Sequence, residues 1–289
     1  MNNTIEDGIK PQPVYAVIHG CFLALGLPLN AVSLWILLRH HGLKSPSAVF
    51  MVNLAISDLL LVISLPMRVY FYATGTWPLS KEACVWIISL YCNNIRSSAI
   101  FITFISVDRL LAVVYPLRSR HLRTASNALK AAGLVWVFIV VMNIPERVEF
   151  SRFLENFNRS ACFEYPRQSH HPHHHILAVT YFQSVLVLTM LAVNIVCTTL
   201  VSWTLRSHLN NSARVNNKVN VMLIFVMNLV IVTICFLPMS IGILGFGVPT
   251  RRALVCLATV NCCLDPLLYY FSLDAFWKKK EDTDLPREQ

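Results

Sequence analysis

Long apolar stretches alternate with short polar ones along almost the whole chain of 289 residues. A helix needs about 20 mostly apolar residues to cross the hydrocarbon core of a bilayer. Seven segments of this kind predict spanning helices, the fourth and seventh being the shortest: residues 14–38, 49–72, 84–114, 129–144, 176–203, 219–246 and 253–271. A polar stretch, 272–280, follows the seventh. The pattern predicts an all-α membrane protein, a seven-transmembrane helix bundle with a short amphipathic eighth helix.

The composition agrees with a membrane protein. Hydrophobic residues make up 55% of the chain and charged residues only 13%, whereas soluble chains average roughly 25% charged residues. The net charge of +9 does not indicate a nucleic-acid partner, because the basic residues flank the spans and form no basic face. No internal repeat stands out, which disfavours an anion transporter. No histidine lies deep in any span, which disfavours an intramembrane hydrolase.

Charges in the loops predict the orientation. The loops after spans one, three and five, and the tail, carry Arg39, Lys44, Arg118, Arg120, Arg123, Arg206, Arg214, Lys218 and Lys278 to Lys280. By the positive-inside rule these face the cytoplasm, although the loop after span four is also basic. Residues 1–13 are then extracellular, and the sequons at Asn2 and Asn158 are candidate glycosylation sites. Residues 1–13 lack the basic start and apolar core of a cleavable signal peptide.

Two of the nine cysteines differ in their setting from the rest. Seven lie inside apolar runs, where a reduced cysteine behaves as a small buried hydrophobe. Only Cys84, at the start of span three, and Cys162, in a polar loop, lie at positions that suit a disulfide. They are the one pair that the sequence predicts to be bonded.

Charged side chains inside the predicted spans are candidate functional residues, because a charge in the bilayer core is costly. Span three contains Arg96, and Asp108-Arg109 at its far end. Asp58 lies in span two and Asp265 in span seven. Two buried acids that meet in a bundle need a cation or a proton between them.

Five pieces of the sequence resemble rhodopsin-class G-protein-coupled receptors: GLPLNAVSLW, NLAISDLLLVISLP, SVDRLLAVVYPLRSR, CFLP and NCCLDPLLYYF. They occur in the family's order, each on its own predicted span, with Trp136 on span four. The resemblance covers residues from about Val14 to Trp277. It implies a seven-transmembrane receptor domain at 14–271, a cytoplasmic eighth helix and tail at 272–289, a plasma-membrane location, a heterotrimeric G protein as partner, and no enzyme activity.

The resemblance also implies roles for particular residues. A sodium ion would lie among Asp58, Ser98 and Asp265; the alternative is a hydrogen-bonded polar cluster without an ion. Asp108 would lock Arg109 until activation; the alternative is a plain ion pair. Pro238 and Pro266 would kink spans six and seven, and Pro116 and Leu117 would contact the G protein. Tyr269 would be the activation switch.

Three features depart from the family pattern. Leu110 replaces the usual aromatic after Asp108-Arg109. Met190 stands where span five usually has a proline, so the bulge of that span is expected to be missing. Only Pro249 and Thr250 separate Val248 from Arg251 at the outer turn, so this connection is expected to be tight or to lack a segment.

Arginines dominate the predicted ligand site. Span three has no acid in its outer half, unlike amine receptors, and span seven has no lysine for a retinal Schiff base. The candidate ligand-binding residues are Arg68, Tyr72, Arg96, Arg251 and Arg252. A guanidinium group matches the oxygens of a phosphate or carboxylate. The alternative for Arg68 and Arg96 is pairing with loop acids such as Glu164, or with carbonyl groups.

Four segments resemble the nucleotide-receptor-like branch of lysophosphatidic acid receptors more closely: SLPMRVYFYATGTWPLSKEAC, SVDRLLAVVYPLRSRHLRT, ACFEYP and LATVNCCLDPLLYYF. The resemblance implies that Arg68 contacts a lipid phosphate. The branch has an aromatic residue where this chain has Arg96, which lies one residue from the arginine of carboxylate-sensing receptors. We therefore expect an anionic lipid ligand, lysophosphatidic acid or a relative. A nucleotide, a hydroxy-carboxylic acid and a tryptophan metabolite are the alternatives.

One further stretch has no counterpart in these patterns. The run from His170 to His175 suits zinc binding or acid sensing. A solvated loop is the alternative interpretation.

Overall fold

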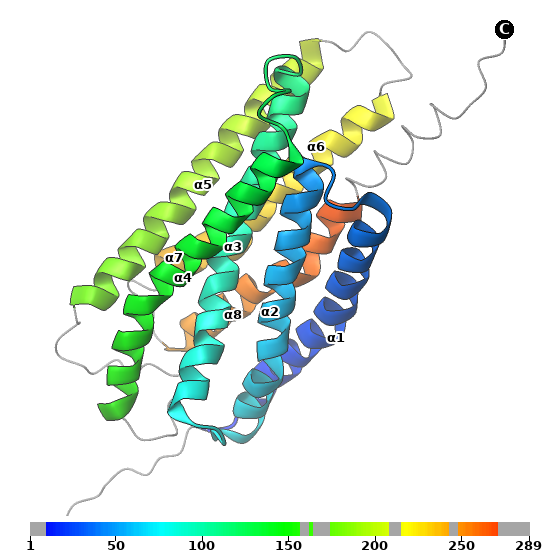
Figure 1. Ribbon diagram of the computed structural model, residues 1–289. Coiled ribbons are helices and arrows are strands. Elements are labelled where there is room, and N and C mark those ends of the chain that lie inside the picture. The colour runs from blue at the N-terminus through cyan, green and yellow to red at the C-terminus, as the bar shows by residue number, and fades with distance from the viewer. Residues whose placement is uncertain (1–9, 157–161, 164–173, 208–214, 243–247, 271–289) are drawn as a thin grey trace, which may run out of the picture.

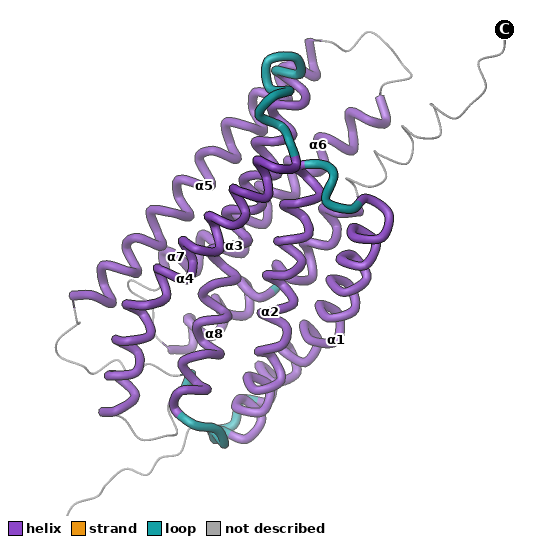
Figure 2. Tube along the Cα trace, in the orientation of Figure 1, coloured by secondary structure: helices purple, strands orange, loops and turns teal. Residues whose placement is uncertain are grey.

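The computed structural model describes residues 10–156, 162–163, 174–207, 215–242 and 248–270 (Figure 1). These residues form helices joined by turns (Figure 2). Seven helices in this part of the chain are long and apolar enough to cross a membrane: Pro13–Arg39, Pro46–Thr74, Lys81–Val114, Ala125–Arg152, Tyr181–Arg206, Val221–Ile241 and Arg251–Tyr270. The predicted seven-helix bundle is confirmed. The predicted eighth helix, Asn2, Asn158, Glu164 and His170 to His173 lie outside the described residues.

The helices run alternately up and down the bundle (Figure 1). The first five spans are α1 (Pro13–Ile36) continued by the π-helical η1 (Leu37–His41), α2 (Pro46–Thr74), α3 (Lys81–Val114), α4 (Ala125–Asn156) and α5 (His174–Ser207). The sixth comprises α6 (Val215–Val230), the π-helical η4 (Ile231–Phe236) and α7 (Leu237–Gly242). The seventh comprises α8 (Val248–Thr259) and a further helix at 261–270.

The fourth span is longer than its sequence suggested. Its predicted end at residue 144 was wrong, because α4 continues through Pro145 to Asn156. The apolar run stops at Pro145, and two charged residues follow it. Both charges have partners: Glu146 pairs with Arg96 inside the bundle, and the Arg147 guanidinium lies 3.3 Å from the centre of the ring of Trp86, which is 58% exposed. Paired charges can continue a span beyond its purely apolar part.

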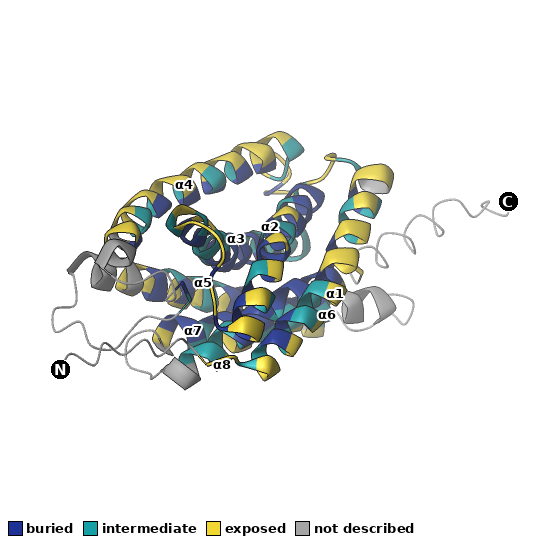
Figure 3. Cartoon of the chain, turned by 90° about the horizontal axis from the view of Figure 1, so that it is seen from below, coloured by how far each residue is buried: buried dark blue, intermediate teal, exposed yellow. Residues whose placement is uncertain are grey.

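The α3 helix lies inside the bundle and packs against α2, α4, α5 and α6. Viewed along the bundle, the buried residues face inward, and the exposed ones form much of the outer surface (Figure 3). That outer surface is apolar: Ile63, Leu134 and Trp203 expose 66%, 71% and 73% of their area. Such residues suit contact with lipid tails. The polar side chains therefore meet in the interior, around α3.

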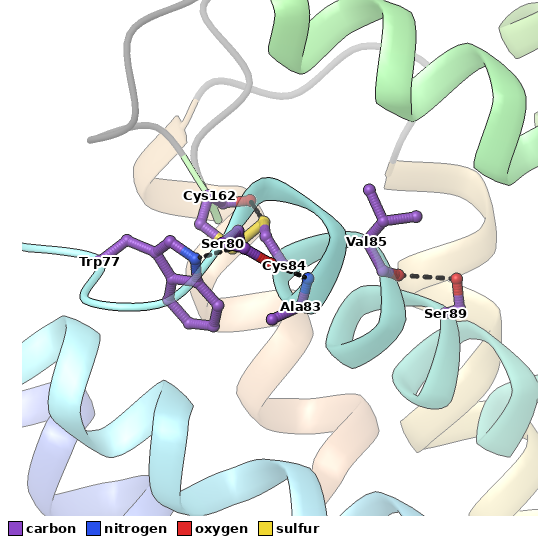
Figure 4. The surroundings of a disulfide bond; sticks show 7 residues. All are labelled: Trp77, Ser80, Ala83, Cys84, Val85, Ser89 and Cys162. Atoms are coloured by element: carbon purple, nitrogen blue, oxygen red, sulfur yellow. Dashed lines mark hydrogen bonds between the residues drawn. A yellow bond between two sulfur atoms is a disulfide. The ribbon is translucent and has the colours of Figure 1, made fainter.

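The start of α3 is fixed by its cap and by the disulfide. Ser80 Oγ accepts a hydrogen bond from the backbone N–H of Ala83 at 3.2 Å, which caps the helix. Trp77 Nε1 donates to the carbonyl of Ser80 at 2.9 Å. The predicted disulfide between Cys84 and Cys162 is present (Figure 4). We call this end of the bundle the disulfide end, and the opposite end the Arg109 end.

Prolines shape the sixth and seventh spans. Pro238 has no N–H to donate to the preceding turn, and the π-helical η4 ends two residues before it. In the seventh span Pro266 leaves the carbonyl of Cys262, four residues earlier, without its helical donor. Asn30 Nδ2 of α1 donates to that carbonyl at 2.6 Å. The α5 helix passes through Met190 as regular α-helix, which confirms the prediction that its bulge is missing.

Candidate functional site

A buried arginine lies between two aromatic rings near the disulfide end. Arg68 of α2 is 3% exposed. Its guanidinium carbon lies 4.7 Å from the ring centre of Tyr91 on α3 and 4.6 Å from that of Phe163. Aromatic faces attract cations at these distances. The Tyr72 hydroxyl, one helical turn after Arg68, is close enough to interact with the guanidinium.

The disulfide positions one of these rings. Phe163 follows Cys162 directly, and Cys162 is bonded to Cys84 at the start of α3. The Phe163 ring centre lies 5.1 Å from that of Phe71 and 5.6 Å from that of Trp77, both in edge-to-face geometry. Phe163 therefore forms one wall of the Arg68 environment, and the disulfide holds this wall in place. Trp77 is 8% exposed and packs beneath this wall.

Two basic side chains, His19 and Arg252, lie near Arg68 and Tyr72. Among the described residues, Arg68 Nε makes no hydrogen bond. His19 of α1 is fully buried beside it, and its ring centre lies 5.3 Å from that of Tyr72. Arg252 of α8 is half-buried and close enough to Tyr72 for electrostatic interaction. Arg251, its neighbour, is also half-buried. A buried guanidinium in this setting is a candidate site for an anion.

The structure brings Arg68, Tyr72 and Arg252 together as the sequence predicts, and it adds residues that the sequence did not reveal. His19, Tyr91 and Phe163 belong to this cluster although they lie on different segments. Phe163 could have been found from its position beside Cys162, because the disulfide fixes it against the start of α3. Nothing in the sequence marks His19 or Tyr91.

Arg96, the second predicted cation, has a different environment. It is 1% exposed and lies about 7.5 Å deeper along α3 than Tyr91, at 1.5 Å per residue. Arg96 Nη1 donates to Glu146 Oε2 at 2.9 Å, and Nη2 binds the other carboxylate oxygen, Oε1. Arg96 Nε donates to Gln183 Oε1 of α5 at 3.0 Å. The carboxylate partner thus comes from α4.

A polar cluster lies in the middle of the bundle, as predicted for Asp58, Ser98 and Asp265. Asn94 Nδ2 donates to Asp58 Oδ1 at 2.9 Å and to Ser98 Oγ at 3.2 Å. Asp265 lies beside Asp58. Asp58 Oδ2 and both oxygens of Asp265 are buried, and none makes a hydrogen bond of ordinary geometry with another described residue. Carboxylate and hydroxyl oxygens suit a hard cation, so this cluster fits a sodium ion.

At the Arg109 end, Asp108 joins three parts of the chain. Its Oδ2 accepts a hydrogen bond from Ser47 Oγ of α2 at 2.5 Å, and its Oδ1 accepts one from Arg123 Nε at 2.8 Å. Arg109, beside it, is half-buried. A cavity of about 210 Å³ lies beside this group, lined partly by Asp108, Arg123 and Phe50.

The remaining switch residues are divided between surface and interior. Pro116 and Leu117 follow α3 and are exposed, Leu117 by 87%. Tyr269 is 1% exposed, and its hydroxyl makes no hydrogen bond with another described residue. Pro238 is half-buried and lies two residues after the end of η4. An exposed apolar group at the Arg109 end suits contact with a protein partner, whereas Tyr269 lies where a rearrangement of the bundle would affect it.

Residues 29–269 match the family model of the 7 transmembrane receptor (rhodopsin family). The chain belongs to this family. It is 30% identical to Lysophosphatidic acid receptor 6 of Gallus gallus, with 94% of each chain covered. It is 32% identical to Lysophosphatidic acid receptor 4 of Homo sapiens, covering 96% of this chain and 79% of the relative. It is 34% identical to Lysophosphatidic acid receptor 5 of Bos taurus, covering 92% and 78%. This rhodopsin-family receptor is therefore a multi-pass membrane protein.

Proposed function

We propose that this receptor binds an anionic lipid, lysophosphatidic acid or a related lysophospholipid, and signals through a heterotrimeric G protein. One observation carries the proposal: Arg68 is buried between Tyr91 and Phe163, and its Nε makes no hydrogen bond among the described residues. A phosphate supplies the negative charge that balances such a guanidinium and the oxygens that accept its hydrogen bonds. The names of the relatives support the same ligand class.

The receptor lies in the plasma membrane with its amino terminus and disulfide end outside. The phosphate reaches Arg68, while Tyr72, Arg251 and Arg252 add donors and positive charge around it. The acyl chain extends among apolar side chains of the bundle, where its burial contributes about 0.8 kcal/mol per methylene group. The receptor carries out no catalytic chemistry.

Activation shifts the population toward a form whose Arg109 end is open. Pro238 and η4 weaken the regular hydrogen bonding of span six, so this is where the helix bends. Arg109, Pro116 and Leu117 then contact the G protein. In the inactive form, Asp58, Ser98 and Asp265 would hold a sodium ion, which would supply the positive charge that two buried acids need.

Substitution of Arg68 tests the head-group site. Arg68→Gln removes the charge and keeps a long polar side chain. Losing hydrogen bonds to a charged group costs about 1.5–3 kcal/mol, so the affinity for lysophosphatidic acid should fall roughly 10- to 150-fold at unchanged surface expression. Competition binding of lysophosphatidic acid to membranes measures this loss. Arg39→Gln is the matched control, because Arg39 is exposed. Equal affinity of the Arg68→Gln and Arg39→Gln receptors would remove Arg68 from the phosphate site.

A further inference from the structure

Glu146 is an acidic residue within a membrane-spanning helix, and its side chain is only 23% exposed. Its two carboxylate oxygens each bind a different terminal nitrogen of Arg96. Gln183 accepts from the third nitrogen, Nε, at 3.0 Å. Three helices thus contribute to one cluster: α3 provides the guanidinium, α4 the carboxylate and α5 the amide. All of the guanidinium nitrogens have partners.

The geometry is that of a carboxylate-binding site with its ligand tethered to the protein. A guanidinium fork that binds both oxygens of one carboxylate is the arrangement by which arginine recognises free carboxylates. The groups that form this site lie in the interior of the bundle, because Arg96 is 1% exposed and Gln183 is 5% exposed. If the Glu146 carboxylate were absent, a buried cation and a space for a small carboxylate would remain.

Glu146 also distinguishes the two buried arginines. Arg96 is neutralised by a partner within the bundle, whereas Arg68 faces two aromatic rings. Cys92 of α3 lies near both arginines and near Glu146, so the two sites are close to one another along this helix. With Glu146 in place, the deeper part of the bundle presents no net positive charge from Arg96. The proposed ligand site then has a positively charged part around Arg68 and a part around Arg96 with no net charge. This arrangement suits an amphiphile.

We propose that Glu146 is a specificity-determining residue: its carboxylate occupies a carboxylate site formed by Arg96 and Gln183, and so confines anion recognition to Arg68. The occupied site follows from the geometry around Arg96. The confinement to Arg68 rests on the proposed function. A receptor that lacks the Glu146 carboxylate acquires a second anion site, selective for small monocarboxylates.

Rescue by a free carboxylate tests the occupied site without any lysophospholipid. Purified wild-type and Glu146→Ala receptors are compared by thermal unfolding in sodium propionate and in sodium chloride, at equal sodium concentration and pH. Glu146→Ala should melt several degrees below the wild type in chloride and regain most of that loss in propionate. The wild type and Gln183→Ala, which both keep the Glu146 carboxylate, should show no difference between the two salts.

The double variant Arg96→Met/Glu146→Ala removes both charges and should melt near the wild type, independent of the salt. Removing one partner of a buried pair is strongly destabilising, whereas replacing both by apolar groups is often neutral. If Glu146→Ala fails to reach the cell surface, the double variant should reach it, and propionate in the medium should increase surface levels of the single variant only. No response of Glu146→Ala to propionate, or an equal response of the double variant, would overturn the proposal.

A signalling assay separates this inference from the ligand assignment. Glu146→Ala, which leaves space beside Arg96, should gain a response to short monocarboxylates, or gain binding of them, through Arg96. If propionate rescue succeeds and lysophosphatidic acid does not bind the wild type, the occupied site stands and the proposed function fails. If lysophosphatidic acid binds and propionate rescue is absent, the reverse holds.

Discussion

At the scale of single residues, several polar side chains in this bundle supply hydrogen bonds that other buried groups need. Asn30 donates to the carbonyl of Cys262, which Pro266 leaves open in the helix of span seven. Asn94 donates to Asp58 and Ser98, and so orders the cluster that faces Asp265. The sequence could place Asp58, Ser98 and Asp265 on their spans. It could not show the bond from Asn30, because that bond joins residues separated by 232 positions.

Asp58→Asn tests the proposed sodium ion at this scale. The substitution keeps the shape of the side chain and removes one of the two buried negative charges, so the affinity for a sodium ion should fall. Agonist affinity should then be equal in sodium and in N-methylglucamine buffers, whereas sodium should lower it for the wild type. Sodium sensitivity that survives in Asp58→Asn would favour the alternative, a hydrogen-bonded cluster without an ion.

At the scale of elements, apolar length identified every span but did not set every end. The end of the fourth span was misplaced because a proline followed by an acid, Pro145-Glu146, resembles the end of a span. The helix continues because Glu146 forms an ion pair with Arg96 on another helix. The pairing of Arg96 with Glu146 was missed for the same reason. A buried arginine that needs an anion, and an acid directly after an apolar run, were the signals that could have revealed it.

The disulfide end provides a test at the element scale. Cys162→Ser breaks the bond that places Phe163 against Arg68 and Trp77. Loss of a disulfide typically costs about 2–4 kcal/mol of stability, and here it also releases one wall of the proposed head-group site. Surface expression and agonist affinity should both fall. Cys197→Ser, at a buried reduced cysteine of α5, controls for loss of the thiol alone. A Cys162→Ser receptor with normal expression and affinity would show that the bond does not shape the site.

At the scale of the whole molecule, the bundle has two distinct ends joined by a polar interior. Arg68, Tyr72 and Arg252 lie toward the disulfide end, the group around Asp58 and Asp265 lies between, and Asp108 and Arg109 lie at the other end. This order could be predicted from the sequence, because each landmark lies on its own span and consecutive spans alternate in direction. The partners of Asp108 on α2 and on the turn after α3 could not, since they depend on how the helices pack.

The central claim is that this receptor recognises an amphiphile with one anionic end. The most direct measurement is G-protein activation in cells that express the chain, with lysophosphatidic acids of increasing acyl length and with nucleotides and small carboxylates alongside. The account predicts activation by lysophosphatidic acid, with potency that rises with acyl length as more methylene groups are buried. Activation by small anions alone, or potency independent of acyl length, would contradict it.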